Sequence, residues 1–258
     1  MSISRFKTFV KGLMWKTGLE VRYAAPHDAL AVQKKLLAGR PVEFVVDGGG
    51  HYGDWTTNYR AAFPSATVTV FEPFPTCVQA LERSFGSDRQ VKLVGKALGE
   101  TTGERTLFCN RLSATNSLFQ VDPAIRELLP DPEWVTPEAE MKIPVVTLDE
   151  YCQEAGVSRV NLLKLDVQGS ELLALRGAEK LLARAAVDLI YTELLFRPHY
   201  QGQAYFFEVA EFLHRHGYSL HGLYNLGVGK EGKMWQADGI FVRAGLAEAN
   251  GPAAAPAV

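Results

Sequence analysis

The chain reads E-F-V-V-D-G-G-G-H-Y-G from residue 43 to residue 53. A short apolar run that closes on an acid and three glycines is typical of a buried strand whose carboxyl end opens onto a ligand. Glycines let a small molecule approach the backbone closely, and a helix that starts just beyond them offers unpaired N–H groups. The segment therefore predicts a ligand-binding turn between a strand and a helix.

A second strand-like run, T-V-T-V-F at residues 67–71, is followed directly by Glu72. An acid at the end of the second strand of such a fold suits the two hydroxyl groups of a ribose. Together the two segments predict a cofactor that contains a nucleoside.

The glycine turn leaves more than one ligand class open. Gly48, Gly50 and Gly53 satisfy the G-x-G-x-x-G spacing of dinucleotide-binding folds, which would make the chain an NAD(P)-dependent oxidoreductase. Asp47, however, would stand close to a pyrophosphate, and like charges a few ångströms apart repel by about 1 to 4 kcal/mol. S-adenosylmethionine carries an ammonium and a sulfonium and no phosphate, so Asp47 favours that cofactor. A tight turn without a ligand, or a non-catalytic binding module of the same fold, are the further alternatives.

Composition excludes several classes of protein. The 258 residues, 47% hydrophobic and 22% charged, suit one α/β domain with extensions or two small domains. A formal net charge of −2 gives no general attraction to nucleic acid, and no apolar stretch approaches the roughly 18 to 20 residues that span a bilayer. The isolated cysteines Cys77, Cys109 and Cys152 indicate a reducing, cytoplasmic location without disulfides or structural zinc.

Three regions are expected along the chain. Residues 1–40 form an N-terminal helical extension, in which the apolar positions 6, 9, 10, 13 and 14 share one helical face. We expect this helix to pack over the domain; a membrane-surface helix or an arm that forms a homo-oligomer are the alternatives. Residues 41–243 form the main domain, and residues 244–258, rich in Ala and Pro, a flexible tail.

Strand and helix patterns alternate through the main domain, which predicts an α/β fold with a doubly wound, mostly parallel, seven-stranded sheet. The strands are expected at 42–47, 67–71, 91–95, 160–166, 187–193, 218–223 and 239–243. Helices are expected at 28–38, 54–63, 76–85, 170–183 with a break at Gly177, 205–216, and from 147 onward with Thr147 and Glu150 as a capping box. Residues 104–109 predict a further strand. Residues 112–144 contain several prolines and predict an irregular insert that serves as a lid or substrate loop.

Acids stand at the carboxyl ends of the predicted strands, where open parallel sheets bind ligands. They are Asp47, Glu72, Asp166, Glu193 and, if the last strand is antiparallel, Asp238. The cofactor accounts for the first two, which leaves three carboxylates around the departing methyl group. Asp166, Glu193 and Asp238 could hold a Mg²⁺ ion, or one of them could be the base that activates an acceptor hydroxyl. His199, in the loop after residues 187–193, is a further candidate base.

With these residues in hand, the chain resembles the FkbM family of S-adenosylmethionine-dependent methyltransferases from about residue 42 to residue 243. The resemblance is carried by V-V-D-G-G-G-H-Y-G (45–53), F-E-P-F-P (71–75), K-A-L-G (96–99), N-S-L (116–118), L-K-L-D-V-Q-G-S-E (163–171), L-x-G-A (175–178), T-E-L (192–194) and D-G-I-F-V (238–242). The D-x-Q-G-x-E element followed by G-A is the specific part. Where the family usually has Asp-Val-Gly-Ala-Asn-x-Gly, this chain has Gly48, Gly50 and His51 in place of Val, Ala and Asn. The hydrogen bond expected from that Asn to the cofactor is lost unless His51 supplies it.

The resemblance implies a class I methyltransferase of Rossmann-like fold that methylates a hydroxyl of a small molecule, namely a sugar, glycoside, glycolipid or polyketide-type natural product. It also implies roles for individual residues. The methionine end of the cofactor would be cradled by Asp47, Gly48, Gly49 and Gly53, and the ribose would be held by Glu72. The adenosine would lie beside Phe71 and Pro73, and its adenine ring would be flanked by Ala97 and Leu98. The methyl group would lie nearest Asp166, and Gln168 and Glu171 complete the signature. No Asn/Asp-Pro-Pro-Tyr element follows residues 160–166, so methylation of a base or amide nitrogen by that device is not indicated.

Overall fold

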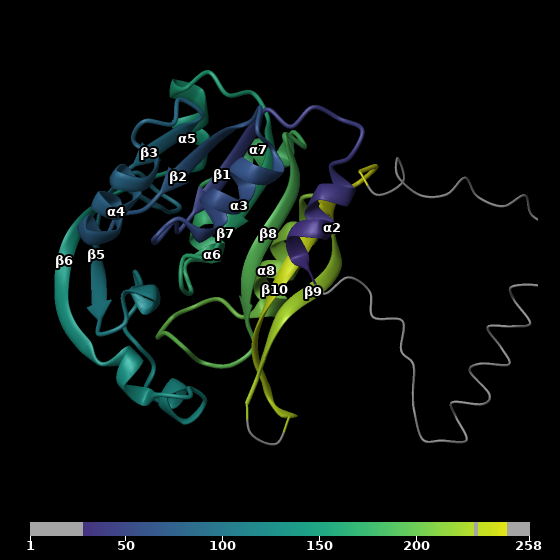
Figure 1. The fold of residues 1–258 in the computed structure, drawn as a ribbon. Coiled ribbons are helices and arrows are strands. Elements are labelled where there is room, and N and C mark those ends of the chain that lie inside the picture. Colours follow the sequence, from purple (N-terminus) through teal and green to yellow (C-terminus); the bar gives the residue numbers. More distant parts are fainter. Residues whose placement is uncertain (1–27, 230–231, 247–258) are drawn as a thin grey trace, which may run out of the picture.

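The computed structural model describes residues 28–229 and 232–246 of the chain (Figure 1). The first described helix, α2 (Ala29–Leu36), begins at Asp28, whose carboxylate accepts hydrogen bonds from the backbone N–H groups of Leu30 and Ala31. The helix expected on residues 6–14, its role as an oligomer arm, and most of the flexible tail lie outside the described residues. No helix in the described part of the chain has the length and apolar character needed to cross a bilayer.

A seven-stranded sheet with the order β3-β2-β1-β7-β8-β10-β9 forms the centre of the domain (Figure 1). Its strands are β1 (Phe44–Gly48), β2 (Thr67–Phe71), β3 (Val91–Val94), β7 (Val160–Leu165), β8 (Val187–Leu195), β9 (Tyr218–Val228) and β10 (Met234–Arg243). The pairs from β3 to β8 are parallel, and β10 runs antiparallel to both of its neighbours. This confirms the doubly wound, mostly parallel, seven-stranded sheet and the antiparallel last strand.

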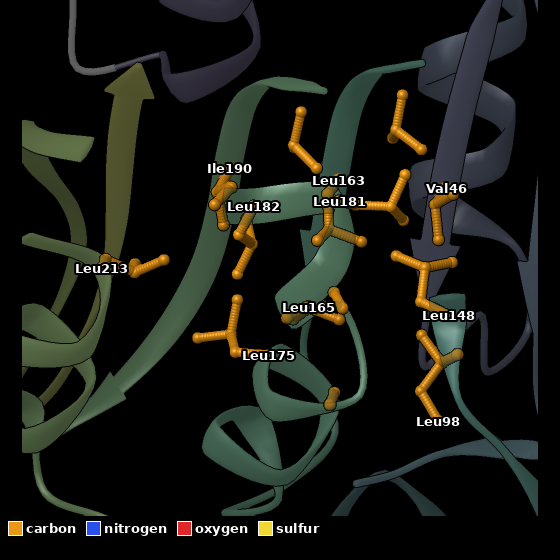
Figure 2. Packing of buried hydrophobic residues seen from close by; sticks show 14 of the residues in the cluster. Val46, Leu98, Leu148, Leu163, Leu165, Leu175, Leu181, Leu182, Ile190 and Leu213 are labelled. Carbon is orange, nitrogen blue, oxygen red and sulfur yellow. The ribbon is translucent and has the colours of Figure 1, made fainter. Parts of the chain in front are cut away.

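Helices cover both faces of the sheet, because successive side chains of each strand point to opposite sides. Val45 and Leu162 pack with α2, α3 (Asp54–Ala62) and α4 (Pro75–Phe85) on one face. On the other face Val46, Leu163 and Ile190 pack with leucines of the remaining helices (Figure 2). Those helices are α5 (Leu148–Glu154), α6 (Glu171–Arg176), α7 (Glu179–Ala183) and α8 (Phe206–Arg215). Strands β7 and β8 are buried along their whole length, as central parallel strands must be.

A small second sheet corrects the expectation for the insert. Its strands are β4 (Ala97–Leu98), β5 (Gly103–Asn110) and β6 (Pro137–Val146), in the order β4-β6-β5. Residues 112–144 were expected to be irregular throughout, but residues 137–144 of this range belong to β6, which is antiparallel to β5. Prolines at both ends of β6 hid it, since Pro is unusual within a strand except at positions that donate no ladder hydrogen bond. The rest of the insert holds three 3₁₀ helices, η1 (Ser113–Thr115), η2 (Pro123–Glu127) and η3 (Pro132–Val135).

Two predicted helix signals differ in their outcome. The hydroxyl of Thr147 accepts a hydrogen bond from the backbone N–H of Glu150, as an N-cap should, but the Glu150 carboxylate binds Thr102 Oγ1 instead of completing a capping box. The predicted break at Gly177 is confirmed, because α6 ends one residue before it. A Cβ atom at this position would lie 2.0 Å from the carbonyl oxygen of Gly99. Only glycine therefore lets the break pack against the segment that follows β4.

Candidate active site

A cavity lies at the carboxyl ends of β1, β2 and β7, where the strand order reverses direction. Open α/β sheets bind their ligands at this position. The lining residues come from the turn after β1, the end of β2, strands β4 and β5, the insert and the turn after β7. They are Gly49, His51, Phe71, Glu72, Pro73, Ala97, Leu98, Leu107, Ser113, Ala114, Asn116, Ser117, Leu118, Asp166, Val167, Gln168 and Ser170.

The glycine turn after β1 lies against the end of β7. Gly49 has φ +81°, and a Cβ atom there would lie 1.9 Å from the backbone oxygen of Asp166. Gly53 has φ +93° at the start of α3, where a Cβ atom would lie 2.5 Å from the Phe85 ring. Of the four turn residues expected to cradle a cofactor, only Gly49 lines the cavity; Gly48 and Gly53 pack inside the domain.

Asp47 does not lie where the sequence predicted it. The residue is 0% exposed, and its Oδ1 lies 3.0 Å from Nζ of Lys164, which is itself only 2% exposed. Its Oδ2 accepts a 2.7 Å hydrogen bond from Thr56 Oγ1. Lys164 also donates to the backbone oxygens of Gly48 at 3.1 Å and Gly49 at 2.7 Å. The expected direct contact between Asp47 and a cationic cofactor stays a prediction that this geometry does not favour, because the charge of Asp47 is matched by Lys164 and the pair supports the turn.

Glu72 lines the cavity at the end of β2, as expected for a ribose-binding acid, although that role stays a prediction. Its Oε2 accepts a 2.8 Å hydrogen bond from the backbone N–H of His51, and its Oε1 a 2.9 Å bond from that of Phe74. Burial raises the pKa of this carboxyl group, while the two N–H donors oppose the shift. Glu72 thus holds the glycine turn and the end of β2 in a fixed relation.

Part of the cavity lining is apolar. Phe71 and Pro73 lie beside Glu72, and Ala97, Leu98 and Leu107 come from the edge of the second sheet. All of these except Leu107 were expected beside the adenosine. A flat aromatic base is the part of a nucleoside that suits such walls.

The insert supplies a part of the cavity wall for which the sequence predicted no individual residues. Ser113, Asn116 and Ser117 line the cavity, and the Ser113 hydroxyl lies 2.9 Å from Nε2 of His51. The N-S-L motif at 116–118 marked this segment without assigning it a role. His51 itself has φ +46°, and burial lowers its pKa. The side chain that replaces the family's Asn therefore lines the cavity and bonds the insert.

Asp166, at the end of β7, is the one predicted catalytic acid that lines the cavity. Its Oδ1 accepts a 2.8 Å hydrogen bond from Nε2 of Gln168. Glu193 is 7% exposed and lies outside the lining, with Oε2 at 3.3 Å from the same amide nitrogen. Burial raises the pKa of Glu193 well above its ordinary value, and Asp166 and Glu171 raise it further. Glu193 is therefore a buried neighbour of Asp166 rather than part of the cavity wall.

The Mg²⁺ site expected from Asp166, Glu193 and Asp238 is not assembled. Across residues 28–229 and 232–246, no group of three or more His, Cys, Asp or Glu side chains is arranged to hold a metal ion. Asp238 faces Glu193 across the β8–β10 pair, but its Oδ2 is taken by Tyr191 Oη at 2.5 Å and Asn225 Nδ2 at 2.6 Å. Hydrogen bonds within the protein thus occupy one of the two oxygens of the Asp238 carboxylate.

His199 is also misplaced for the expected role of general base. The residue is 4% exposed and does not line the cavity. Its Nδ1 lies 2.9 Å from the backbone oxygen of Arg197, its ring stacks on Trp235 with centroids 5.4 Å apart, and its backbone N–H donates to Gln203. Burial lowers its pKa. These contacts make His199 a support of the segment that follows β8.

The chain matches the family model described as "Methyltransferase FkbM domain" over residues 47–220, well over half of its length. The matched range begins at Asp47 and includes Glu72, Asp166 and Glu193.

Several characterised proteins share part of this sequence. The chain is similar to "2-O-methyltransferase NoeI" of Sinorhizobium fredii, with 24% identity over 183 residues that cover 69% of this chain and 74% of that protein. It is similar to "Methyltransferase 1" of Beauveria bassiana, with 28% identity covering 53% of this chain and 58% of that protein. It is also similar to "31-O-demethyl-FK506 methyltransferase FkbM" of Streptomyces tacrolimicus, with 28% identity covering 54% and 61%. The chain thus matches less than two thirds of the length of the last two.

Solved structures with a related arrangement include Aeropyrum pernix fibrillarin in complex with natively bound S-adenosyl-L-methionine. The two chains are 13% identical, with a TM-score of 0.44 and coverage of 83% of this chain and 73% of that one. A putative RNA methyltransferase from Pyrococcus horikoshii is 14% identical, with a TM-score of 0.42 and coverage of 86% and 87%. Likeness at this level says nothing about what the present chain binds.

Proposed function

The chain belongs to the FkbM family of S-adenosylmethionine-dependent methyltransferases, and from that membership we propose that it transfers a methyl group to a hydroxyl oxygen of a small molecule. The observation that carries the proposal is the position of Asp166. This acid lines the same cavity as Glu72, at the carboxyl ends of the paired strands β1 and β7. One acid is thus available for a nucleoside and another for the reacting groups.

The chemistry of the cavity fits the cofactor. Two residues that line it each carry a buried polar atom, Nδ2 of Asn116 and Oγ of Ser170, that has no hydrogen-bond partner among the described residues. An unpaired buried polar group costs about 1 to 3 kcal/mol, so a ligand that satisfies both atoms gains from them. The apolar part of the lining, which includes Phe71, Leu98 and Leu107, suits an adenine ring. Glu72 and Asp166 bring negative charge to a ligand that carries two cationic centres.

Bound there, S-adenosylmethionine would supply an electrophilic methyl group on a cationic sulfur. We assign the ribose hydroxyls to Glu72 and the adenine to the walls formed by Phe71, Leu98 and Leu107. Gly49 lines the cavity where the turn packs against the Asp166 backbone, and we assign the methionine end of the ligand to this part of the site. Asp47 acts on the cofactor only through the turn that it supports.

We assign to Asp166 the role of the general base that accepts the proton of the acceptor hydroxyl. An alcohol is a weak nucleophile at neutral pH, and a positioned base contributes about 10² to 10⁴ in rate. Oδ1 of Asp166 is held by Gln168, whereas no described residue donates a hydrogen bond to Oδ2. Oδ2 is therefore free to accept the hydroxyl proton as the oxygen–methyl bond forms.

The relatives support oxygen as the acceptor atom. Two of them carry names that describe O-methylation, one a 2-O-methyltransferase and the other a 31-O-demethyl-FK506 methyltransferase. We extend to this chain what the two names share, which is methylation of an oxygen atom, and we propose a glycoside or polyketide alcohol as the class of acceptor.

Calorimetry with S-adenosylhomocysteine and, separately, with NAD tests the cofactor. We expect binding of the first and none of the second; binding of NAD alone would overturn the proposal. A screen with labelled methyl donor then compares glycosides and polyketide alcohols with amino sugars of matched structure. Label that appears as a methyl ether supports the proposal, and label found only on nitrogen contradicts it.

A further inference from the structure

Gln168 joins four separate parts of the active site. Its Nε2 donates to Asp166 Oδ1 at 2.8 Å and lies 3.3 Å from Glu193 Oε2. Its Oε1 accepts a 2.7 Å hydrogen bond from Tyr200 Oη, and its backbone oxygen a 2.6 Å bond from Ser117 Oγ. Both polar atoms of the side chain are therefore engaged in a residue that lines the cavity.

The backbone at this position is strained. Gln168 has φ +54°, a region that costs a residue with a side chain roughly 1 to 2 kcal/mol. Such strain persists only where the surroundings over-determine it, and it gathers at functional sites. Glu171 Oε1 accepts hydrogen bonds from the backbone N–H groups of Val167 and Gly169. A Cβ atom on Gly169 would lie 2.8 Å from the Tyr200 ring. The turn is thus held on both sides in the conformation that aims the Gln168 side chain.

Two partners of Gln168 belong to the insert, which lines the cavity, and to the segment after β8. Ser117 is part of the insert, and Tyr200 lies in the segment after β8. These two segments are joined, because Val121 forms a β-bridge with Tyr200 and the backbone N–H of Gln201 donates to Gln120. In Figure 1 both lie beyond the carboxyl ends of the parallel strands. Gln168 therefore contacts the insert and the segment after β8 through Ser117 and Tyr200, and it contacts Asp166 through its amide nitrogen.

A neutral amide suits this position for an electrostatic reason. Asp166, Glu171 and Glu193 surround the turn, and burial together with the neighbouring acids raises the pKa of both Glu171 and Glu193. The two hydrogens of one amide nitrogen point at two different carboxylates without adding charge. An ionised carboxylate in place of this amide would offer no donor to either of them and would add a further negative charge.

We propose that Gln168 is a positioning residue that holds the Asp166 carboxylate toward the acceptor hydroxyl and ties that orientation to the closed insert. When Ser117 and Tyr200 are in place, the amide is fixed and Asp166 Oδ1 keeps its donor. When the insert and the segment after β8 move away together, the amide oxygen loses Tyr200 and the backbone oxygen of Gln168 loses Ser117. The inference rests on the proposed O-methyl transfer and adds a device that couples closure of the site to chemistry.

The substitution Gln168→Glu tests the link to catalysis, because it keeps the size of the side chain. With a glycoside acceptor found in the screen above, we expect kcat at pH 8 to fall roughly 10- to 100-fold while the acceptor KM and the Kd of S-adenosylhomocysteine change less than about threefold. The deficit should shrink as pH falls, because the introduced carboxyl group regains an O–H donor when it is protonated. Asp166, Glu171, Glu193 and Tyr200 face this position, and the three acids would raise the pKa of the introduced group into the measured range.

Gln153→Glu is the matched control, since Gln153 is exposed on α5; it should leave kcat and its pH profile unchanged. A Gln168→Glu variant with a kcat within twofold of the parent at every pH overturns the link to Asp166. A deficit that does not change with pH also overturns it, because loss of structure alone would give that result.

Hydrogen exchange tests the link to the insert without any acceptor. In the presence of S-adenosylhomocysteine, Gln168→Ala should raise amide exchange across residues 113–121 by about tenfold or more, while exchange in β7 stays slow. Unchanged exchange in the insert overturns the coupling. If the parent protein binds S-adenosylhomocysteine but methylates no hydroxyl compound, the proposed function fails, and the exchange result still decides whether Gln168 anchors the insert.

Discussion

Nζ of Lys164 lies 3.0 Å from Oδ1 of Asp47 in the interior of the protein, and the same nitrogen donates to the backbone oxygens of Gly48 and Gly49. Burial lowers the pKa of Lys164, but Asp47, Asp166 and Glu72 together hold that pKa above its ordinary value, so the side chain stays charged. Asp47 is therefore enclosed by the protein and does not line the cavity. The glycine turn owes its position to a buried ion pair.

Loss of this pair should be costly. Lys164→Met keeps the length of the side chain but leaves Asp47 buried without its counter-charge, and we expect the free energy of unfolding to fall by about 3 to 5 kcal/mol. In the double variant with Asp47→Asn, the loss should be smaller than the sum of the two single losses. Urea denaturation measures all three, and Lys180→Met, at an exposed lysine, should change stability by no more than about 0.5 kcal/mol. Strict additivity of the two single variants would contradict the pairing.

Gly49 and Gly39 form a matched pair for testing the close approach at the cavity. Their φ angles are +81° and +78°, but a Cβ atom on Gly39 meets nothing within 4 Å, whereas one on Gly49 would lie 1.9 Å from the Asp166 backbone. Gly39→Ala should cost about 1 to 2 kcal/mol from φ alone. Gly49→Ala should cost a further 1 to 3 kcal/mol and weaken S-adenosylhomocysteine binding at least tenfold. If both variants lose the same free energy of unfolding and the affinity for S-adenosylhomocysteine does not change, the turn can move to accommodate the Cβ atom and the close approach is not required.

Asp166→Asn removes the assigned proton acceptor with little change in shape. We expect kcat to fall by about 10² to 10⁴ while the Kd of S-adenosylhomocysteine stays within a few-fold of the parent value. Single-turnover kinetics and calorimetry give the two quantities. Asp28→Asn serves as control, because Asn caps a helix as well as Asp does and α2 contributes nothing to the cavity. Turnover at the parent rate in Asp166→Asn would remove this residue from the mechanism.

Glu72→Gln tests the nucleoside end of the cavity. The amide offers one acceptor oxygen where the carboxylate has two, so one of the bonds from His51 or Phe74 is lost together with the negative charge. We expect the Kd of S-adenosylhomocysteine to rise about tenfold, which corresponds to roughly 1.4 kcal/mol. Glu154→Gln, at an exposed glutamate, is the control for calorimetry. An unchanged Kd would mean that Glu72 serves only the turn.

Glu171 should give the protein a characteristic pH dependence of stability. Burial raises the pKa of this residue from 4.5 to about 7. Because the folded-state pKa lies above the unfolded one, the unfolded chain releases this proton first, and stability falls as pH rises from about 4.5 to about 7. Compared with Glu171→Gln, the parent should lose roughly 1 to 3 kcal/mol across that window and nothing further above it. Denaturation curves that run parallel for the two proteins would exclude the effect.

The sheet and two of its acids were predictable, for a simple reason. Strands such as β2 and β7 are short apolar runs closed by Glu72 and Asp166, and in a parallel sheet every such ending falls on one edge. Sequence position alone was enough to bring these two residues to the cavity. It was not enough for Glu193 and Asp238, because the end of a strand does not say how far a side chain is covered by its neighbours.

Lys164 shows what could have been found. A lysine between Leu163 and Leu165 in a strand buried on both faces must be paired, since an isolated charge there is prohibitively costly. Of the two neighbouring strands, β1 carries a single carboxylate, Asp47, and pairing Lys164 with it would have removed that acid from the ligand. His199 and the strand β6 were beyond such reasoning, because their environments depend on contacts between segments distant in sequence.

Gly177 has a bearing on protein engineering. Its missing side chain lets the helix break rest on the carbonyl oxygen of Gly99, next to the walls formed by Ala97 and Leu98. A side chain introduced at Gly177 to improve helix propensity would displace Gly99 and, through it, the cavity wall formed by Ala97 and Leu98. A stabilising mutagenesis campaign should therefore treat this helix junction as part of the binding site, although no ligand would touch it.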